Sequence, residues 1–153
     1  MEASVAGGDA ANIASDDVAK IHMWFERLST FVRAVDFEGA RVIFAEDMVA
    51  FGTFSDFVIG RAAVEAKQWR SVWPHIADFR WNLADARTMV SKDRMLAVGM
   101  ACFDSTGFER DGSRYNRPGR ATVAFRRAKP GDDWIAYHTH MSLFRGVPQQ
   151  SFR

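Results

Sequence analysis

The spacing of the apolar residues changes once along this 153-residue chain, and that change limits the folds it can adopt. Before Phe79, apolar side chains recur at the three- and four-residue spacings of an α-helix; after it, they alternate with polar ones as in a β-strand. Two strand patterns, residues 120–127 and 134–144, flank the turn sequence AKPGDD. Helices followed by an antiparallel meander predict an α+β fold, with one curved sheet and about three helices on one face.

The first helix is predicted to begin at Ser15, whose hydroxyl can accept a hydrogen bond from a free backbone N–H. Asp16 and Asp17 then place negative charge at the positive end of the helix dipole. One apolar stripe follows at helical spacing: Val18, Ile21, Phe25, Leu28, Val32 and Val35. Residues 1–14 are small and aperiodic, which predicts a flexible arm, so the domain is expected over 15–147 with a short tail at 148–153.

Two shorter helices are expected at residues 38–44 and 61–73. The second should end at Pro74, because proline disfavours the α conformation in the residue before it. The run at 95–103 is apolar at nearly every position, which predicts a central strand covered on both faces. The polar, glycine-containing stretch that follows it is expected to form a long loop or a loose hairpin end.

The charge and composition exclude several classes of partner. The net charge is +1 with both signs interspersed, so no broad field is available to attract nucleic acid or an acidic membrane surface. No stretch approaches the roughly 20 apolar residues of a membrane span, and the first residues do not resemble a secretion signal. The single cysteine, Cys102, agrees with a reducing compartment. We therefore expect a cytoplasmic protein without nucleic-acid or membrane partners.

Two histidines share one face of the last predicted strand. In a regular strand, Trp134, Ala136, His138 and His140 all point the same way. That face is either the concave side of the sheet or its outer surface, and alternation alone does not choose. The histidines could line a cavity and exchange protons, or they could simply hydrogen-bond neighbouring polar groups. No third ligand at suitable spacing accompanies them, so neither a metal site nor a cofactor is expected.

Several short motifs appear in an order that resembles the NTF2-like cone-shaped α+β fold, in its SnoaL-like (polyketide-cyclase-like) and calmodulin-dependent kinase association-domain branches. The resemblance covers about residues 16–146. The segments VAFGT and IGRAAVEAKQW look like a loop and the third helix of that family. The strand motifs are Arg120 and Thr122 before the last hairpin, Trp134, and the His-x-His-x-Ser of His138, His140 and Ser142.

The resemblance implies a sheet wrapped around a mostly apolar cavity, and dimers formed through the outer face of the sheet. Ketosteroid-isomerase relatives would carry an aspartate base where this chain has Phe51 and Gly52, and the nearest acid is Asp56. Association domains would carry an arginine on the third strand, where this chain has GMACF. The motifs therefore predict the fold more specifically than any reaction.

Two functions remain open at this stage. The first is binding of a small, largely apolar molecule in the cone cavity. The molecule could carry an anionic group, and binding could occur with or without acid–base chemistry of the isomerase, cyclase or lyase type. The second is an oligomeric association module, a homodimer or larger, whose cavity is vestigial. The candidate catalytic residues are His138 and His140. The candidate ligand-binding residues are Trp24, Phe51, Asp56, Trp69, Trp73, Trp81, Arg120, His138 and His140.

Overall fold

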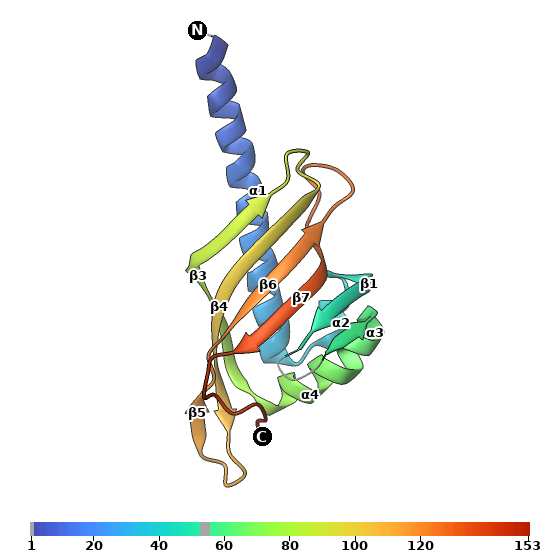
Figure 1. The fold of residues 1–153 in the computed structure, drawn as a ribbon, viewed down its shortest axis with the longest axis vertical. Helices are drawn as coiled ribbons and strands as arrows, with labels where there is room; N and C mark the ends of the chain where they lie inside the picture. The colour runs from blue at the N-terminus through green and yellow to red at the C-terminus, as the bar shows by residue number, and fades with distance from the viewer. Residues whose placement is uncertain (1, 53–55) are drawn as a thin grey trace.

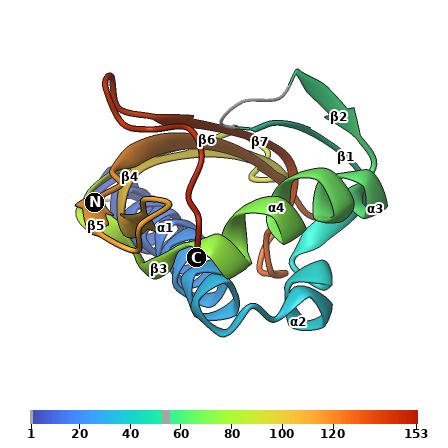
Figure 2. The same cartoon turned by 90° about the horizontal axis from the view of Figure 1, so that it is seen from below.

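The protein forms two layers, a curved seven-stranded sheet and a set of helices on its inner face (Figures 1 and 2). The structure, a computed structural model, describes residues 2–52 and 56–153, with side chains from residue 15 onward. Thr53, in the family-like VAFGT segment, lies outside the described residues. The predicted α+β architecture is confirmed.

The helical layer is dominated by α1 (Glu2–Ala34), which lies across the inner face of the sheet and extends beyond it at the N-terminal end (Figure 1). The helix begins at Glu2 and not at Ser15, so Ser15 is not its N-cap. The flexibility of residues 1–14 stays a prediction. The other helical elements are α2 (Phe37–Arg41), α3 (Arg61–Val64), η1 (Glu65–Trp69), α4 (Arg70–Val72) and η2 (Trp73–His75).

The sheet has the order β2-β1-β7-β6-β4-β3, with β5 paired to β4. The meander predicted from the second half of the chain is present, and β1 joins it by pairing with β7 in parallel. Of the two alternatives predicted after residue 103, a long loop or a loose hairpin end, the structure has the hairpin: β4 continues to Phe108 and pairs with the short β5. The strands are β1 (Phe44–Phe51), β2 (Phe57–Ile59), β3 (Ala77–Val90), β4 (Leu96–Phe108), β5 (Arg114–Asn116), β6 (Gly119–Arg126) and β7 (Ile135–Leu143).

The core lies between α1 and the inner face of the sheet. The predicted apolar stripe of α1 supplies buried Ile21, Phe25, Leu28 and Val32. The one aromatic residue among these four, Phe25, meets the sheet edge to face, a favourable geometry for rings. Phe25 lies 6.1 Å from the ring centroid of Phe125 on β6.

Strand β7 contains a bulge that decides which side chains face the core. Ala136 pairs with Phe125, whereas His138 pairs with Ala124, so Tyr137 is an extra residue between two regular pairs. The expectation that Ala136 and His138 share a face is therefore wrong. Ala136 is buried against the helices, and both histidines lie on the outer face, away from α1.

A buried cluster of charges joins α1 to the two hairpin turns at one end of the sheet. The Asp17 carboxylate, 1% exposed, accepts hydrogen bonds from Arg94 Nε at 2.7 Å and Arg127 Nη2 at 2.6 Å. Arg127 also lies 3.8 Å above the ring of Trp134. The hydrogen bond from Arg94 lowers the pKa of Asp17, and burial opposes this. Asp17 is thus an interior partner for two arginines, not a helix-start charge.

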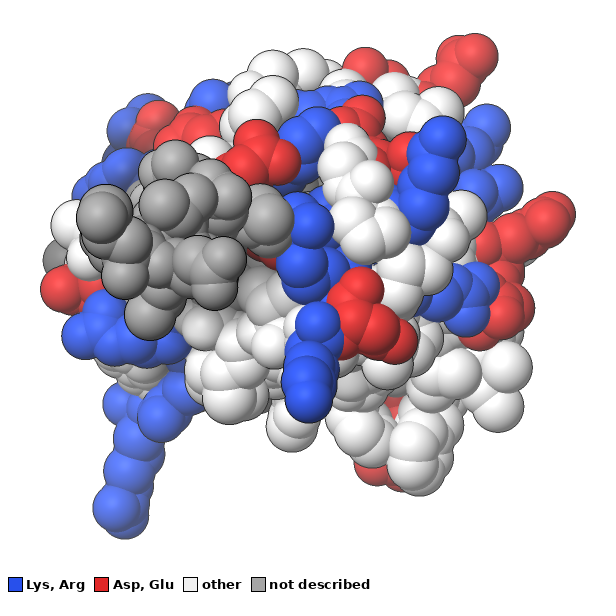
Figure 3. Space-filling view, turned by 90° about the horizontal axis from the view of Figure 1, so that it is seen from above, with Lys and Arg blue, Asp and Glu red and all other residues white. Residues whose placement is uncertain are grey.

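Charges of both signs are interspersed over the end of the molecule drawn in Figure 3. In the described part of the chain, no helix combines the length and the apolar character needed to cross a membrane.

Candidate functional site

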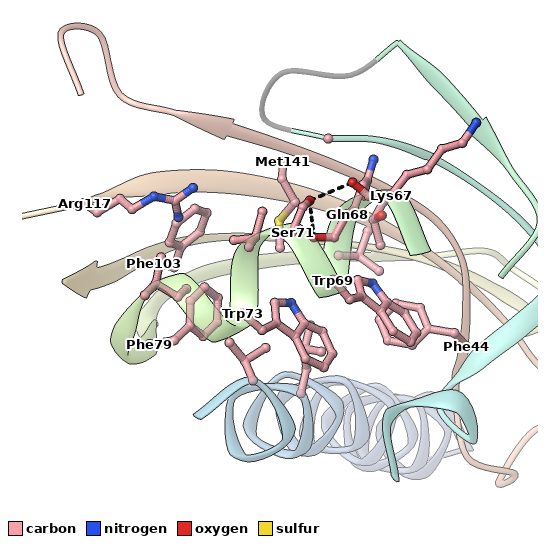
Figure 4. A pocket seen from close by; sticks show the side chains of 17 residues that line it. Phe44, Lys67, Gln68, Trp69, Ser71, Trp73, Phe79, Phe103, Arg117 and Met141 are labelled. Carbon is pink, nitrogen blue, oxygen red and sulfur yellow. Dashed lines mark hydrogen bonds between the residues drawn. The ribbon is translucent and has the colours of Figure 1, made fainter. Parts of the chain in front are cut away.

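A cavity of about 70 Å³ lies between the inner face of the sheet and the helical segment α3 to η2 (Figure 4). Its walls are mostly aromatic. Trp69 and Trp73 come from the helical segment and stack with their ring centroids 5.0 Å apart. Phe79 and Phe103 come from β3 and β4. The cavity is therefore shaped to accept a small apolar group.

The helical wall of the cavity contains a π-helical turn, η1. A π-helical turn is wider than an α-helical one and is frequent at functional sites. Here Lys67, Gln68 and Trp69 all line the cavity although they are consecutive. The Gln68 Nε2 amide is buried and has no hydrogen-bond partner among the described residues. This amide is therefore a candidate donor to a ligand.

Glu65 fixes this π-helical turn to the neighbouring helix. Its carboxylate accepts hydrogen bonds from Arg41 Nε at 2.6 Å and from Arg70 Nη2 at 2.8 Å. The hydrogen bond from Arg41 is the largest influence and holds the pKa of Glu65 at about 2; burial acts in the opposite direction, and Arg70 adds to the lowering. Glu65 is thus an ionised anchor of the cavity wall.

Arg117 stands at the other end of the cavity, near Phe103 and Phe79 in Figure 4. It is 2% exposed, and its Nε has no hydrogen-bond partner among the described residues. No described carboxylate forms an ion pair with it. Burial lowers the pKa of the guanidinium, and Tyr115 partly opposes that effect. A guanidinium nevertheless remains charged in proteins, so the cavity contains a positive charge that no described carboxylate neutralises.

A second, larger hollow of about 500 Å³ adjoins the cavity. It lies under the C-terminal residues 149–153, where His75 Nδ1 and the main-chain oxygen of Arg153 are 2.9 Å apart. The two spaces share four lining residues, Ser71, Val72, Ile76 and Arg117. Arg117 therefore lies where the aromatic cavity meets the more open hollow.

The structure places two of the predicted ligand-binding tryptophans, Trp69 and Trp73, in the cavity wall. The other two lie in the core. Trp24 donates its indole N–H to the Ile43 carbonyl at 2.9 Å. Trp81 packs between rings, 4.8 Å from Phe25.

The remaining predicted site residues lie outside the cavity lining. His138 donates from Nδ1 to the Val49 carbonyl at 2.8 Å, because a carbonyl can only accept, and this bond joins β7 to β1. Phe51 contacts both histidine rings on the outer face, with His140 at 5.0 Å. Asp56 is exposed before β2, and Arg120 is exposed beside Phe144. The hydrogen-bonding alternative for the histidines fits His138.

Sequence patterns did not identify the five polar residues of the cavity lining: Lys67, Gln68, Ser71, Arg117 and Thr139. A signal existed for Arg117. It has the same parity as the inward-facing Ala121 and Val123, and Pro118 after it favours an extended backbone. The alternation of β6 could thus have been extended backwards to Arg117. For Thr139, the bulge at Tyr137 reverses the alternation of β7, so regular spacing from Trp134 does not indicate that Thr139 faces the cavity.

Comparison with known proteins agrees with this architecture. A family model described as "SnoaL-like domain" matches residues 21–146. No curated protein matches the chain.

Three similar solved structures show the range of proteins with this fold. An NTF2-like superfamily protein from Salmonella enterica has a TM-score of 0.72 at 15% identity, over 85% of this chain and 92% of that one. A ketosteroid isomerase-like protein from Erwinia carotovora has a TM-score of 0.69 at 15% identity, over 84% and 96%. The association domain of C. elegans CaMKII has a TM-score of 0.61 at 13% identity, over 88% and 98%. At these identities the likeness concerns the fold alone.

Proposed function

This chain belongs to the SnoaL-like domain family, and on that premise we propose that it binds a small, largely apolar molecule in its cavity. The observation that carries the proposal is the combination of aromatic walls with buried donors that lack protein partners. Buried polar groups are normally hydrogen-bonded, because leaving one unpaired is costly. Gln68 Nε2 and Arg117 Nε, which have no hydrogen-bond partner among the described residues, border the same cavity. A bound molecule would supply what both lack.

The volume of the cavity limits the size of the group that enters it. The inner cavity, about 70 Å³, is smaller than the engineered apolar cavity of about 150 Å³ that binds benzene. One small ring or a short aliphatic chain is the expected occupant after modest rotation of the wall side chains. Any further part of the ligand would extend past Arg117 into the adjoining hollow.

The described cavity lining contains no carboxylate and no imidazole. An acid–base reaction of the isomerase, cyclase or lyase type therefore has no evident proton acceptor among the described residues that line the cavity. Such a reaction, with His138 and His140 as candidates, stays a prediction from sequence. We propose binding as the function that the geometry supports best.

The second candidate, an association module, is favoured by a different surface. The outer face of the sheet carries exposed apolar side chains at both ends, Phe57 and Ile59 on β2 and Met89 and Leu96 on β3 and β4. Self-association would cover them. We propose a homodimer through this outer face. It is compatible with a ligand in the cavity, because the two surfaces lie on opposite sides of the sheet.

Native mass spectrometry of freshly purified protein tests both candidates at once. The binding proposal expects a dimer that carries an additional small organic mass, and loss of that mass in Trp73→Ala. A larger bare ring would favour the association module. Phe57→Lys should weaken the dimer, whereas Val42→Lys, at a 63% exposed site between α2 and β1, should not. Equal dimerisation of the two variants would contradict the proposed interface.

A further inference from the structure

We propose that Arg117 is the binding site for a carboxylate, so that the ligand of the cavity is a small carboxylic acid with an aromatic or short aliphatic tail. This inference rests on the proposed function and names the chemical class that the same cavity takes. Its evidence lies in the burial of one side chain, in what surrounds that side chain, and in how rigidly its backbone is held.

Arg117 differs from the other buried charged residues in the described part of the chain. There are four such residues, and Asp17, Glu65 and Arg127 form ion pairs with one another or with other arginines. Only Arg117 lacks a partner of opposite charge. An unpaired charge in the interior is expensive to maintain, so its partner is expected to come from outside the chain.

The backbone around Arg117 is fixed before any ligand arrives. Its N–H donates to the Ser105 carbonyl at 2.8 Å, and its own carbonyl accepts from Ser105 Oγ at 2.8 Å. Gly119, two residues on, lets the Phe103 ring pack against the strand, because a Cβ there would overlap the ring. The side chain therefore starts from a rigid position beside an aromatic wall, which reduces the entropy lost on binding.

A carboxylate matches this site better than other anions. The planar guanidinium presents parallel N–H groups that pair with the two oxygens of a carboxylate. Lys67 also borders the cavity, but its side chain points away from it in Figure 4. In the described lining of the inner cavity, Arg117 is the one cation directed at the ligand, which balances a monoanion, whereas a phosphate dianion would require a second. The aromatic walls next to Arg117 select an apolar tail.

Calorimetric titration of the full chain with two matched probes tests the inference. Phenylacetate and phenylacetamide have nearly the same size and differ in charge. We expect phenylacetate to bind at least about tenfold more tightly, because charge-assisted hydrogen bonds are roughly twice as strong as neutral ones. Arg117→Met should abolish the preference, so that phenylacetate and phenylacetamide bind the variant with similar affinities. Arg117→Lys should restore part of the preference.

The possible outcomes distinguish carboxylate recognition by Arg117 from the more general proposal that the cavity binds a small molecule. Equal binding of the two probes to the wild-type protein would overturn the carboxylate assignment and leave the binding function standing. If neither probe binds, and no small molecule is retained on purification, the binding function fails as well. A structural role for Arg117 predicts a lower melting temperature for ligand-free Arg117→Met. We expect a higher one, since the variant removes an unpaired buried charge.

Discussion

Two buried arginines flank strand β6, and they are held in opposite ways. Arg127, just after the strand, has a fully buried side chain that pairs with Asp17 at 2.6 Å and lies over Trp134. Arg117, two residues before the strand, is 2% exposed and has no charged partner in the described structure. Both lie inside the same small domain. They differ in whether the chain itself neutralises the charge.

This difference distinguishes a charge kept for the fold from a charge kept for a ligand. In a buried ion pair, each charge is neutralised by the other within the folded chain. Removing one partner therefore leaves the other charge buried and uncompensated, which is destabilising. An unpaired charge is incomplete until something binds. Stability should therefore depend strongly on Asp17 and Arg127, whereas ligand affinity should depend on Arg117.

The largest effect on stability is expected at the buried ion pair of Asp17 and Arg127. Asp17→Ala should lower the free energy of unfolding by about 3–5 kcal/mol, because it leaves the buried guanidinium of Arg127 without its carboxylate. Urea denaturation measures the change. Arg80→Ala is a matched control, since its ion pair with Asp104 is exposed and should contribute less than about 1 kcal/mol. Similar losses in the two variants would contradict the claim that the buried ion pairs of Asp17 stabilise the fold more than an exposed ion pair does.

The second prediction concerns Arg117, to which an added carboxylate would supply the negative charge that the described chain does not. At 100 times its dissociation constant, phenylacetate should stabilise the protein by about 2.7 kcal/mol through mass action. The urea midpoint with and without the acid measures this at a fixed concentration. The same concentration should stabilise Arg117→Met far less. A shift of equal size in that variant would show that the acid binds elsewhere.

The third prediction concerns Glu65, which is paired like Asp17 but at the cavity wall. The pKa of Glu65 is about 2 in the folded protein, whereas a glutamate without partners has a pKa of 4.5. The ionised carboxylate therefore stabilises the fold fully above about pH 4.5. That contribution is lost as the pH falls from about 4.5 to 2. Glu65→Gln should cost about 2 kcal/mol near neutral pH, as expected for charged hydrogen bonds. Its urea midpoint should fall less steeply in acid, and parallel curves would contradict this.

The smallest effects are expected on the outer face. His138→Ala should cost about 1 kcal/mol of stability, because it removes the hydrogen bond to the Val49 carbonyl. His140→Ala should change stability by less than about 0.5 kcal/mol. Neither should alter the affinity for phenylacetate by more than about twofold. A tenfold loss in either variant would place a histidine in the binding site.

The fold could be predicted from sequence because it follows from spacing. The stripe of α1 and the alternation of β6 each bury one side of a regular element, so residues such as Phe25 and Val123 reveal their own environment. Family motifs at His138 to Ser142 added the topology. The start of α1 was the exception, because residues 2–14 are helical without an apolar stripe to indicate it.

The candidate site was harder to predict because it depends on which face a residue occupies. Trp69 and Trp73, singled out by their helical spacing, both lie in the cavity wall. The two histidines attracted attention as residue types, but the bulge at Tyr137 and the outer face decide their role. Arg117 lay in a stretch that reads as loop, and the absence of a partner for it is visible only in three dimensions.

The bulge at Tyr137 determines how strand β7 would tolerate the loss of a codon. Tyr137 is the one residue of β7 that its neighbour β6 does not pair with, so an in-frame loss of its codon would leave Ala136 facing inward and His138 outward. Loss of the codon for Thr139 would instead turn His140 toward the cavity and Met141 toward solvent. Two deletions that lie only two codons apart therefore have different effects. Loss of Tyr137 keeps both faces of β7 as they are, whereas loss of Thr139 exchanges the two faces after the deletion.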